Sequence, residues 1–488
     1  MLFAVEMWER FSYYGMRALL VLYLVNGLGW SDGNAARLYG TYTSLVWLTP
    51  IIGGYLADRF LGTRRSMIIG ALVITTGHFL LAMQMTPLFY AGLACVIIGT
   101  GFFKPNVSTQ VGQLYKAGDP RRDAGFTIFY MGINLGATIA PIVCGYLGER
   151  IGWHYGFGAA GVGMLLGLLA YLKWRAQLLP GIGLPPTQEA KVARQQAEST
   201  QPNNMRLGAI GAVLGALVVW LAAGADLNIA RWIAGGGWVQ LILGVCVGGA
   251  LSISVLGTRG DERKRVIALF VVTFFVIFFW TAFEQAGSSM NIFADRFTDR
   301  QVGSFNIPAS WFQSVNASFI ILCAPLVAWL WRYLGAQGRE PSTPLKMVIG
   351  LVLVGLGFVF MVIGARGADA CAAQLGADAA REQCRVASPM WLVIAYLMHS
   401  LGELAVSPVG LSYVTKIAPA RLVSMLMGVF FLSNAVANYL GGVLAAQTEN
   451  IATQGAFFSI PVVTSWGAAL LMLALVPLLK RLTISAKV

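Results

Sequence analysis

Long apolar runs joined by short polar segments account for most of this chain. Residues 266–279, for example, contain no charged side chain and almost no polar one. A helix of about 20 apolar residues spans the hydrocarbon core of a bilayer, whereas a transmembrane strand alternates apolar and polar residues over about ten positions. The continuous runs therefore predict an all-α polytopic protein embedded in a lipid bilayer, and they exclude a transmembrane β-barrel.

The composition narrows the class further. Charged residues make up 11% and hydrophobic residues 57% of the 488 positions. A soluble protein has roughly 25% charged residues, so a water-soluble enzyme, a disordered chain and a fibrous repeat are all disfavoured. The net charge of +13 could indicate nucleic-acid binding, but most Lys and Arg residues fall in loops on one side of the predicted membrane, as the positive-inside rule expects. We expect an inner-membrane protein with cytoplasmic termini and no nucleic-acid partner.

Hydropathy and helix breakers predict fourteen membrane spans. They cover residues 2–26, 37–58, 66–84, 88–110, 124–148, 152–174, 207–225, 231–257, 266–289, 308–332, 343–365, 388–413, 421–445 and 455–480. This grouping of six, two and six predicts an N-terminal six-helix bundle over residues 1–174 and a C-terminal six-helix bundle over 266–488. Between them we expect a cytoplasmic linker and two extra transmembrane helices over 175–265.

This plan resembles the major facilitator superfamily, in which two six-helix halves rock about a binding site at the membrane midplane. The segment GGYLADRFLGTRR at residues 53–65 resembles the superfamily's signature cytoplasmic loop. Its glycines permit close helix contact, and Asp58 can accept hydrogen bonds from helix N-terminal amides or from a neighbouring Arg. An ordinary positive-inside loop is the alternative interpretation of these residues.

The first span contains charged residues where hydropathy predicts none. Glu6, Arg10, Tyr13, Tyr14 and Arg17 follow helical spacing and share one stripe. Each charge costs about 2.5–3.5 kcal/mol at a helix centre on insertion scales, so such groups normally face a cavity. Carboxylates and guanidiniums on one stripe can share charge, and a carboxylate among them could exchange a proton as its Arg partner moves. Side chains snorkelling from a helix end are the alternative, but this does not explain Arg17.

Other spans also carry polar residues. In the first half, Lys104 precedes Pro105, and Tyr130 and Asn134 lie in the fifth span, where a lone Asn is more often an interhelical hydrogen bonder. The second half contributes Trp280, Glu284, Asn316, Glu403 and Ser407. Prolines 105 and 408 predict local helix breaks beside Lys104 and Glu403. The inventory is basic in the first half and acidic in the second, although Glu6 and Glu9 partly offset the basic set, and this polarity suits a zwitterionic ligand.

Four motifs in the expected order resemble those of the proton-dependent oligopeptide transporter family, bacterial type. They are EMWERFSYYG at residues 6–15, Asp58-Arg59, FYMGINLG at 129–136 and GELAVSP at 402–408. The two extra spans also resemble the insertion found in its bacterial members. The resemblance implies a proton-coupled symporter that imports di- and tripeptides by alternating access.

The resemblance also implies a role for each matched residue. Arg10, Tyr14 and Lys104 would hold the peptide carboxylate, and Asn134, Asn316 and Glu403 its amino group. The side-chain pockets would be formed by Tyr13, Trp47, Trp280 and Phe430, and Tyr130 and Ser407 would also bind the substrate. Arg17–Glu284 would be the extracellular gate and Lys104–Glu403 the cytoplasmic gate, and the candidates for proton coupling are Glu6, Glu9, Arg10 and Glu284. Trp47 stands where the family usually has Tyr, and Phe430 where it usually has Trp, so the preference for peptide side chains can differ here.

The resemblance implies no enzyme activity and no cofactor other than the coupling proton. We expect a monomer, because one chain supplies both halves of the site. Alternatives on the same scaffold are transport of nitrate, a peptide-like drug or another small organic anion. A polytopic membrane enzyme and a channel or receptor are the alternatives from other classes.

The cysteines and histidines suggest structural roles. Cys371 and Cys384 lie in one polar loop on the predicted outer side, where a disulfide is plausible in an oxidising compartment. The other cysteines lie in apolar segments and are expected to pack as small hydrophobes. His78, His154 and His399 are scattered and are expected to be packing residues, and no spacing indicates a metal site.

Overall fold

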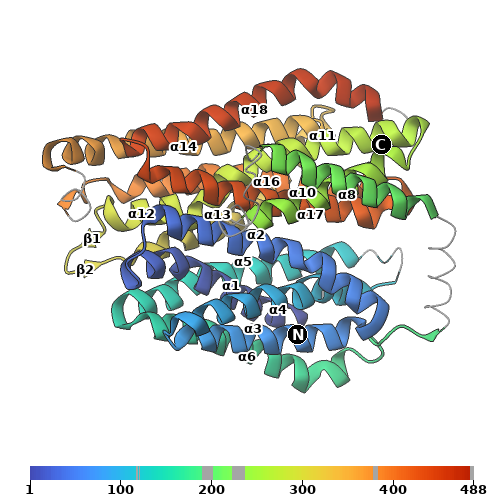
Figure 1. Ribbon diagram of the computed structural model, residues 1–488, viewed down its shortest axis with the longest axis horizontal. Coiled ribbons are helices and arrows are strands. Elements are labelled where there is room, and N and C mark those ends of the chain that lie inside the picture. Colours follow the sequence, from blue (N-terminus) through green and yellow to red (C-terminus); the bar gives the residue numbers. More distant parts are fainter. Residues whose placement is uncertain (117–118, 120, 189–201, 223–236, 377–382, 484–488) are drawn as a thin grey trace.

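Long helices run side by side in the computed structural model, which describes residues 1–116, 119, 121–188, 202–222, 237–376 and 383–483 (Figure 1). The first bundle contains α1 (Leu2–Leu22), α2 (Asp32–Leu56), α3 (Gly62–Ala82), α4 (Thr86–Gln113), α5 (Arg122–Tyr146) and α6 (Trp153–Leu178). The pair α8 (Pro202–Ala222) and α10 (Trp238–Leu256) follows. The second bundle contains α11 (Gly260–Phe283), α12 (Ser289–Arg296), α13 (Phe312–Ala336), α14 (Thr343–Leu375), α16 (Pro389–Ile417), α17 (Val423–Ala445) and α18 (Gln454–Thr483).

Each of the fourteen expected spans overlaps one of these helices. Eleven segments of the described residues are long and apolar enough to cross a membrane. Helix α1 is also long enough to cross a membrane, but it is not among these eleven apolar segments because it carries the charged stripe. Parts of the expected spans 207–225 and 231–257 fall on residues 223–236, and part of the expected linker falls on 189–201; both lie outside the described residues. The chain is a nearly all-helical, multi-pass membrane protein.

Several helices extend beyond the apolar runs that predicted them. Helix α11 begins at Gly260, so the charged residues 261–265, which lie between two expected spans, form its first turns. Helix α14 continues to Leu375, past the expected end at residue 365. Hydropathy marks only the part of a helix that is apolar enough for the hydrocarbon core, and polar end turns can continue the same helix outside it.

The helix breaks predicted at Pro105 and Pro408 are wrong. Helices α4 and α16 continue through both prolines. Beside Pro105, the amide of the Asn106 side chain donates to the carbonyl of Phe102 at 2.7 Å. Polar side chains and neighbouring helices can satisfy backbone groups near an intramembrane proline, so a proline need not end the helix.

The two bundles meet where α2 packs against α17 and α5 against α13. Glycines permit the close approach of the first pair, because a Cβ atom on Gly40 would lie 2.6 Å from the Cα atom of Gly442. The pair α8 and α10 lies beside the second bundle, with α10 packing on α17 and α11. There the Gln240 amide donates to the Tyr439 hydroxyl at 2.8 Å.

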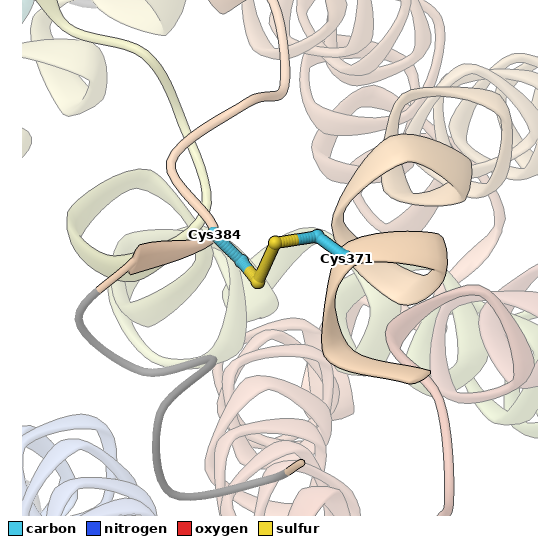
Figure 2. Close-up of a disulfide and its surroundings, with 2 residues drawn as sticks. All are labelled: Cys371 and Cys384. Atoms are coloured by element: carbon cyan, nitrogen blue, oxygen red, sulfur yellow. A yellow bond between two sulfur atoms is a disulfide. The ribbon is translucent and has the colours of Figure 1, made fainter. Parts of the chain in front are cut away.

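We call the end of the molecule that carries the antiparallel strands β1 (Gln301–Val302) and β2 (Phe305–Asn306) the hairpin end. It lies at the left of Figure 1, and the opposite end, where α1 begins and α18 ends, is called the terminal end. At the hairpin end Cys371 and Cys384 form the anticipated disulfide (Figure 2). The segment after Cys384 is held beside the hairpin, since the Ala387 amide donates to the Phe297 carbonyl at 2.9 Å.

Glu149 joins the two bundles at the hairpin end. Its carboxylate accepts hydrogen bonds from the backbone amides of Ala309 (2.8 Å) and Ser310 (2.9 Å) and from the Ser310 hydroxyl (2.5 Å). The Glu449 carboxylate also links the two bundles at this end, but it accepts a single hydrogen bond, from the backbone amide of Gly33 at 2.7 Å. These bonds hold the hairpin end closed.

The unequal bonding of Glu149 and Glu449 gives a stability prediction. We expect Glu149→Gln to lower the free energy of unfolding by about 2–3 kcal/mol, because hydrogen bonds to a charged group are each worth about 1.5–3 kcal/mol and the amide retains only part of the acceptor capacity. The readout is the thermal unfolding midpoint of the purified protein. Glu449→Gln is the matched control and should lower the midpoint less; equal midpoints for the two variants would contradict the prediction.

Candidate functional site

A cavity of about 330 Å³ lies between the two bundles. Helices α1, α2, α4 and α5 line it from the first bundle, and α11, α13, α16 and α17 from the second. The site residues expected from the sequence that line it are Glu6, Arg10, Tyr13, Tyr14, Arg17, Trp47, Lys104, Tyr130, Asn134, Trp280, Glu284, Asn316, Glu403, Ser407 and Phe430. Glu9 does not line the cavity but contacts Arg10, which does.

Arg10 is held by two carboxylates of its own helix. Its Nη2 atom donates to Glu9 at 2.6 Å, and its Nε atom, which also bonds Glu9, lies 3.3 Å from Glu6. The guanidinium also lies 5.2 Å from the centroid of the Tyr13 ring. All three charged side chains are buried. Such a cluster can keep its charges only because they compensate one another, and moving Arg10 toward a ligand would leave the carboxylates short of a partner.

Arg17 connects the two bundles on the hairpin side of the cavity. Its Nη2 atom lies 2.5 Å from the Glu284 carboxylate, and its Nε donates to the Tyr39 hydroxyl at 2.6 Å. The Arg17 and Glu284 side chains are only 8% and 5% exposed. The pair is therefore desolvated and bridges the two bundles.

Lys104 and Glu403 are not paired in this conformation. The Lys104 ammonium instead lies 3.3 Å from the centroid of the Trp47 indole. Glu403 receives a hydrogen bond from the Asn316 amide at 3.4 Å, and the same amide donates to the Ser400 hydroxyl at 2.9 Å. The cation is thus held by α2 and the carboxylate by α13.

The electrostatic layout matches the polarity read from the sequence. Arg10 and Lys104 lie on the wall formed by the first bundle, while Glu403 and Glu284 lie on the other wall. Two further polar atoms of the second wall, Ser407 Oγ and Trp280 Nε1, are buried and hydrogen bond to no other described residue. Buried polar atoms normally have partners, so these are available to a ligand or to water.

Several residues that line the cavity were not predicted from the sequence. Asn434, one turn after Phe430 on α17, presents a buried side-chain oxygen with no partner among the described residues. An Asn in an apolar span was a usable signal, as it was for Asn134. His399 was expected only to pack; it lies 4.8 Å from the Phe358 ring, centroid to centroid, and also lines the cavity. Further lining residues that were not predicted include Gln313, Tyr396, Leu411 and Phe431.

A vestibule of about 980 Å³ adjoins the cavity toward the terminal end. Tyr130 lines both spaces, and on α16 Glu403 faces the cavity while Leu404 faces the vestibule. Lys346 and Lys416, at the terminal-end turns of α14 and α16, also line the vestibule. The bonds at the hairpin end and this vestibule at the other together describe a site reached from the terminal end.

Comparison with known proteins identifies the family. The sequence profile described as "POT family" matches residues 64–195 and 236–463. The chain belongs to the POT family. It is 37% identical to the "Peptide transporter YePEPT" of Yersinia enterocolitica over 98% of this chain and 93% of that protein. It is 35% identical to the "Di-/tripeptide transporter" of Lactococcus lactis over 94% of this chain and 90% of that protein.

A solved POT structure has the same fold. The crystal structure of a peptide transporter POT in complex with sulfate superimposes with a TM-score of 0.81 and 36% identity, covering 99% of this chain and 94% of that one. This places the chain in the major facilitator fold that its loop motif and its six-two-six plan predicted. In this POT chain, no group of three or more His, Cys, Asp or Glu side chains in the described residues is placed to hold a metal ion.

Proposed function

We propose that this chain is a proton-coupled symporter that imports di- and tripeptides across the cytoplasmic membrane by alternating access. The observation that carries the proposal is the opposition of Arg10 and Lys104 to Glu403 and Asn316 across one cavity. A short peptide is a zwitterion whose two ends match those walls. The volume of about 330 Å³ lies at the small end of ligand pockets, roughly 300–1,000 Å³, which limits the length of the peptide.

In this proposal each end of the peptide has its own group of residues. Arg10, Tyr14 and Lys104 bind the carboxylate, while Glu403, Asn316 and Asn134 bind the ammonium. Aromatic and polar wall residues meet the peptide side chains: Tyr13, Trp47, Tyr130, Trp280, Ser407 and Phe430. Because Asn134 donates to the Tyr130 carbonyl within α5, its side-chain oxygen is the atom that remains for an ammonium.

Transport would proceed by rocking of residues 1–174 against 266–488 in a monomer with cytoplasmic termini. The hairpin end is then the outer face, and the closed Arg17–Glu284 pair with an open vestibule corresponds to an inward-facing state. Protonation of Glu284 would release Arg17 and let the outer end open. The Lys104–Glu403 pair would form when the inner end closes, and peptide carboxylate competing for Lys104 would loosen it. The Glu6, Glu9 and Arg10 cluster is the second candidate for carrying the proton.

Uptake into proteoliposomes tests the proposal directly. With an inward proton gradient of one pH unit we expect labelled dialanine to accumulate about tenfold, since one pH unit is worth about 1.4 kcal/mol per proton. A protonophore should abolish the accumulation. Equal uptake with and without the gradient would reject proton coupling.

Transport of nitrate or another small anion on the same scaffold makes a different prediction. Such a substrate has no ammonium group, and therefore does not use Glu403. If the chain is a peptide transporter, unlabelled dipeptides should compete with labelled dialanine for uptake, whereas nitrate should not. Competition by nitrate alone would favour the anion transporter.

A further inference from the structure

Lys104 has an aromatic partner where a carboxylate was expected. Its ammonium lies 3.3 Å from the centroid of Trp47, and no carboxylate of the described residues forms an ion pair with it. Trp47 in turn stacks on Phe431, with ring centroids 6.3 Å apart and an interplanar angle of 22°. Since Phe431 belongs to α17, this contact runs from α4 through α2 to the second bundle.

The attraction between a cation and a ring is strongest for Trp and grows when the cation is out of water. Lys104 is on a cavity wall between two bundles, so its ammonium has lost part of its hydration. A carboxylate carries a full negative charge and remains the stronger partner in such a site. The Trp47 indole is therefore the partner of the Lys104 ammonium while the site is empty, and a ligand carboxylate can take its place when it binds.

We propose that Trp47 is a specificity-determining residue: it holds Lys104 while no carboxylate is bound, and so sets how strongly the site prefers a free C-terminal carboxylate over a neutral C-terminus. This inference rests on the proposed function. A peptide with a free carboxylate must take Lys104 from the indole, which reduces its net binding energy. A peptide amide does not draw Lys104 away and avoids that loss. The preference for the acid is thus weaker than Lys104 alone would provide.

The measurement is the ratio of two dissociation constants, that of dialanine amide divided by that of dialanine, by calorimetry on the purified full-length protein. In Trp47→Leu we expect the ratio to rise about tenfold, because the competing ring is gone. The loss of apolar wall area affects both peptides and cancels in the ratio. Trp47→Tyr keeps an aromatic ring that attracts a cation less strongly than Trp, so its ratio should lie between those of the wild type and Trp47→Leu. Because this substitution is conservative, it also tests the inference if Trp47→Leu fails to fold.

Two controls isolate the contact. Phe283→Leu removes another aromatic side chain from the same cavity, on α11, without removing the ring above Lys104, and should leave the ratio unchanged. In a Lys104→Gln background, Trp47→Leu should no longer change the ratio. An unchanged or lower ratio in Trp47→Leu, with both peptides still bound, would overturn the inference and leave the proposed function intact. If the wild-type protein bound neither peptide, the proposed function would fail, and this inference with it.

Discussion

Replacing Glu284 with Gln should abolish proton-driven peptide accumulation while leaving counterflow exchange intact. Glu284 forms the buried bridge to Arg17 at 2.5 Å across the bundles. Gln has nearly the same shape but cannot take up or release a proton. The Arg17 guanidinium would therefore lack its ionic partner permanently. In the wild type it would lack that partner only while Glu284 is protonated. Both loaded conformations would stay accessible, but their interconversion would no longer be linked to proton movement.

Proteoliposomes separate these two activities. Under an inward gradient of one pH unit, accumulation of labelled dialanine should fall from about tenfold to none, while exchange against internal unlabelled dialanine should continue. Glu262→Gln is a suitable control, because Glu262 pairs with Arg421 at 2.7 Å with its side chain 38% exposed, away from the cavity. That variant should accumulate peptide like the wild type. Full driven uptake by Glu284→Gln would remove Glu284 from the coupling step.

Features set by local geometry could be read from the sequence. Apolar runs located the helices, since the length needed to cross a bilayer is fixed by helical rise. The stripe of Glu6, Arg10 and Arg17 could be placed on one face because spacing of three and four residues fixes direction around a helix. The basic and acidic walls followed from the half of the chain that carries each intramembrane charge, because the two halves were expected to face each other across one site.

Features set by packing between distant helices could not be read in this way. The Tyr39 hydroxyl bonds Arg17, and Phe431 stacks on Trp47 across the bundles. Neither contact is implied by spacing within a helix, because it depends on how far and at what angle α2 meets α1 and α17. The partner of Lys104 was missed for a related reason. A motif can name two residues able to pair, but it does not say which conformation has brought them together.

Glu403→Gln should weaken binding of peptides with a free amino terminus by about thirtyfold or more. Removing one partner of a buried charge pair costs about 2–5 kcal/mol, and Glu403 is the carboxylate that Asn316 orients at the cavity wall. The amide is neutral, so a peptide ammonium would be left with dipoles alone. An N-acetylated peptide brings no charge to this wall, and its binding should change little.

The decisive comparison is therefore between dialanine and N-acetyl-dialanine on the same two proteins, measured as dissociation constants. Glu340→Gln provides a matched control, because Glu340 is an acidic residue of the vestibule that pairs with Lys346 at 2.5 Å and does not line the cavity. It should affect neither peptide at equilibrium. Should Glu403→Gln weaken both peptides equally, Glu403 would be acting on the shape or closure of the site, and the assignment of the ammonium to this wall would be wrong. A loss confined to dialanine would instead fix the orientation of the bound peptide, with its amino end on the second bundle and its carboxylate toward Arg10 and Lys104.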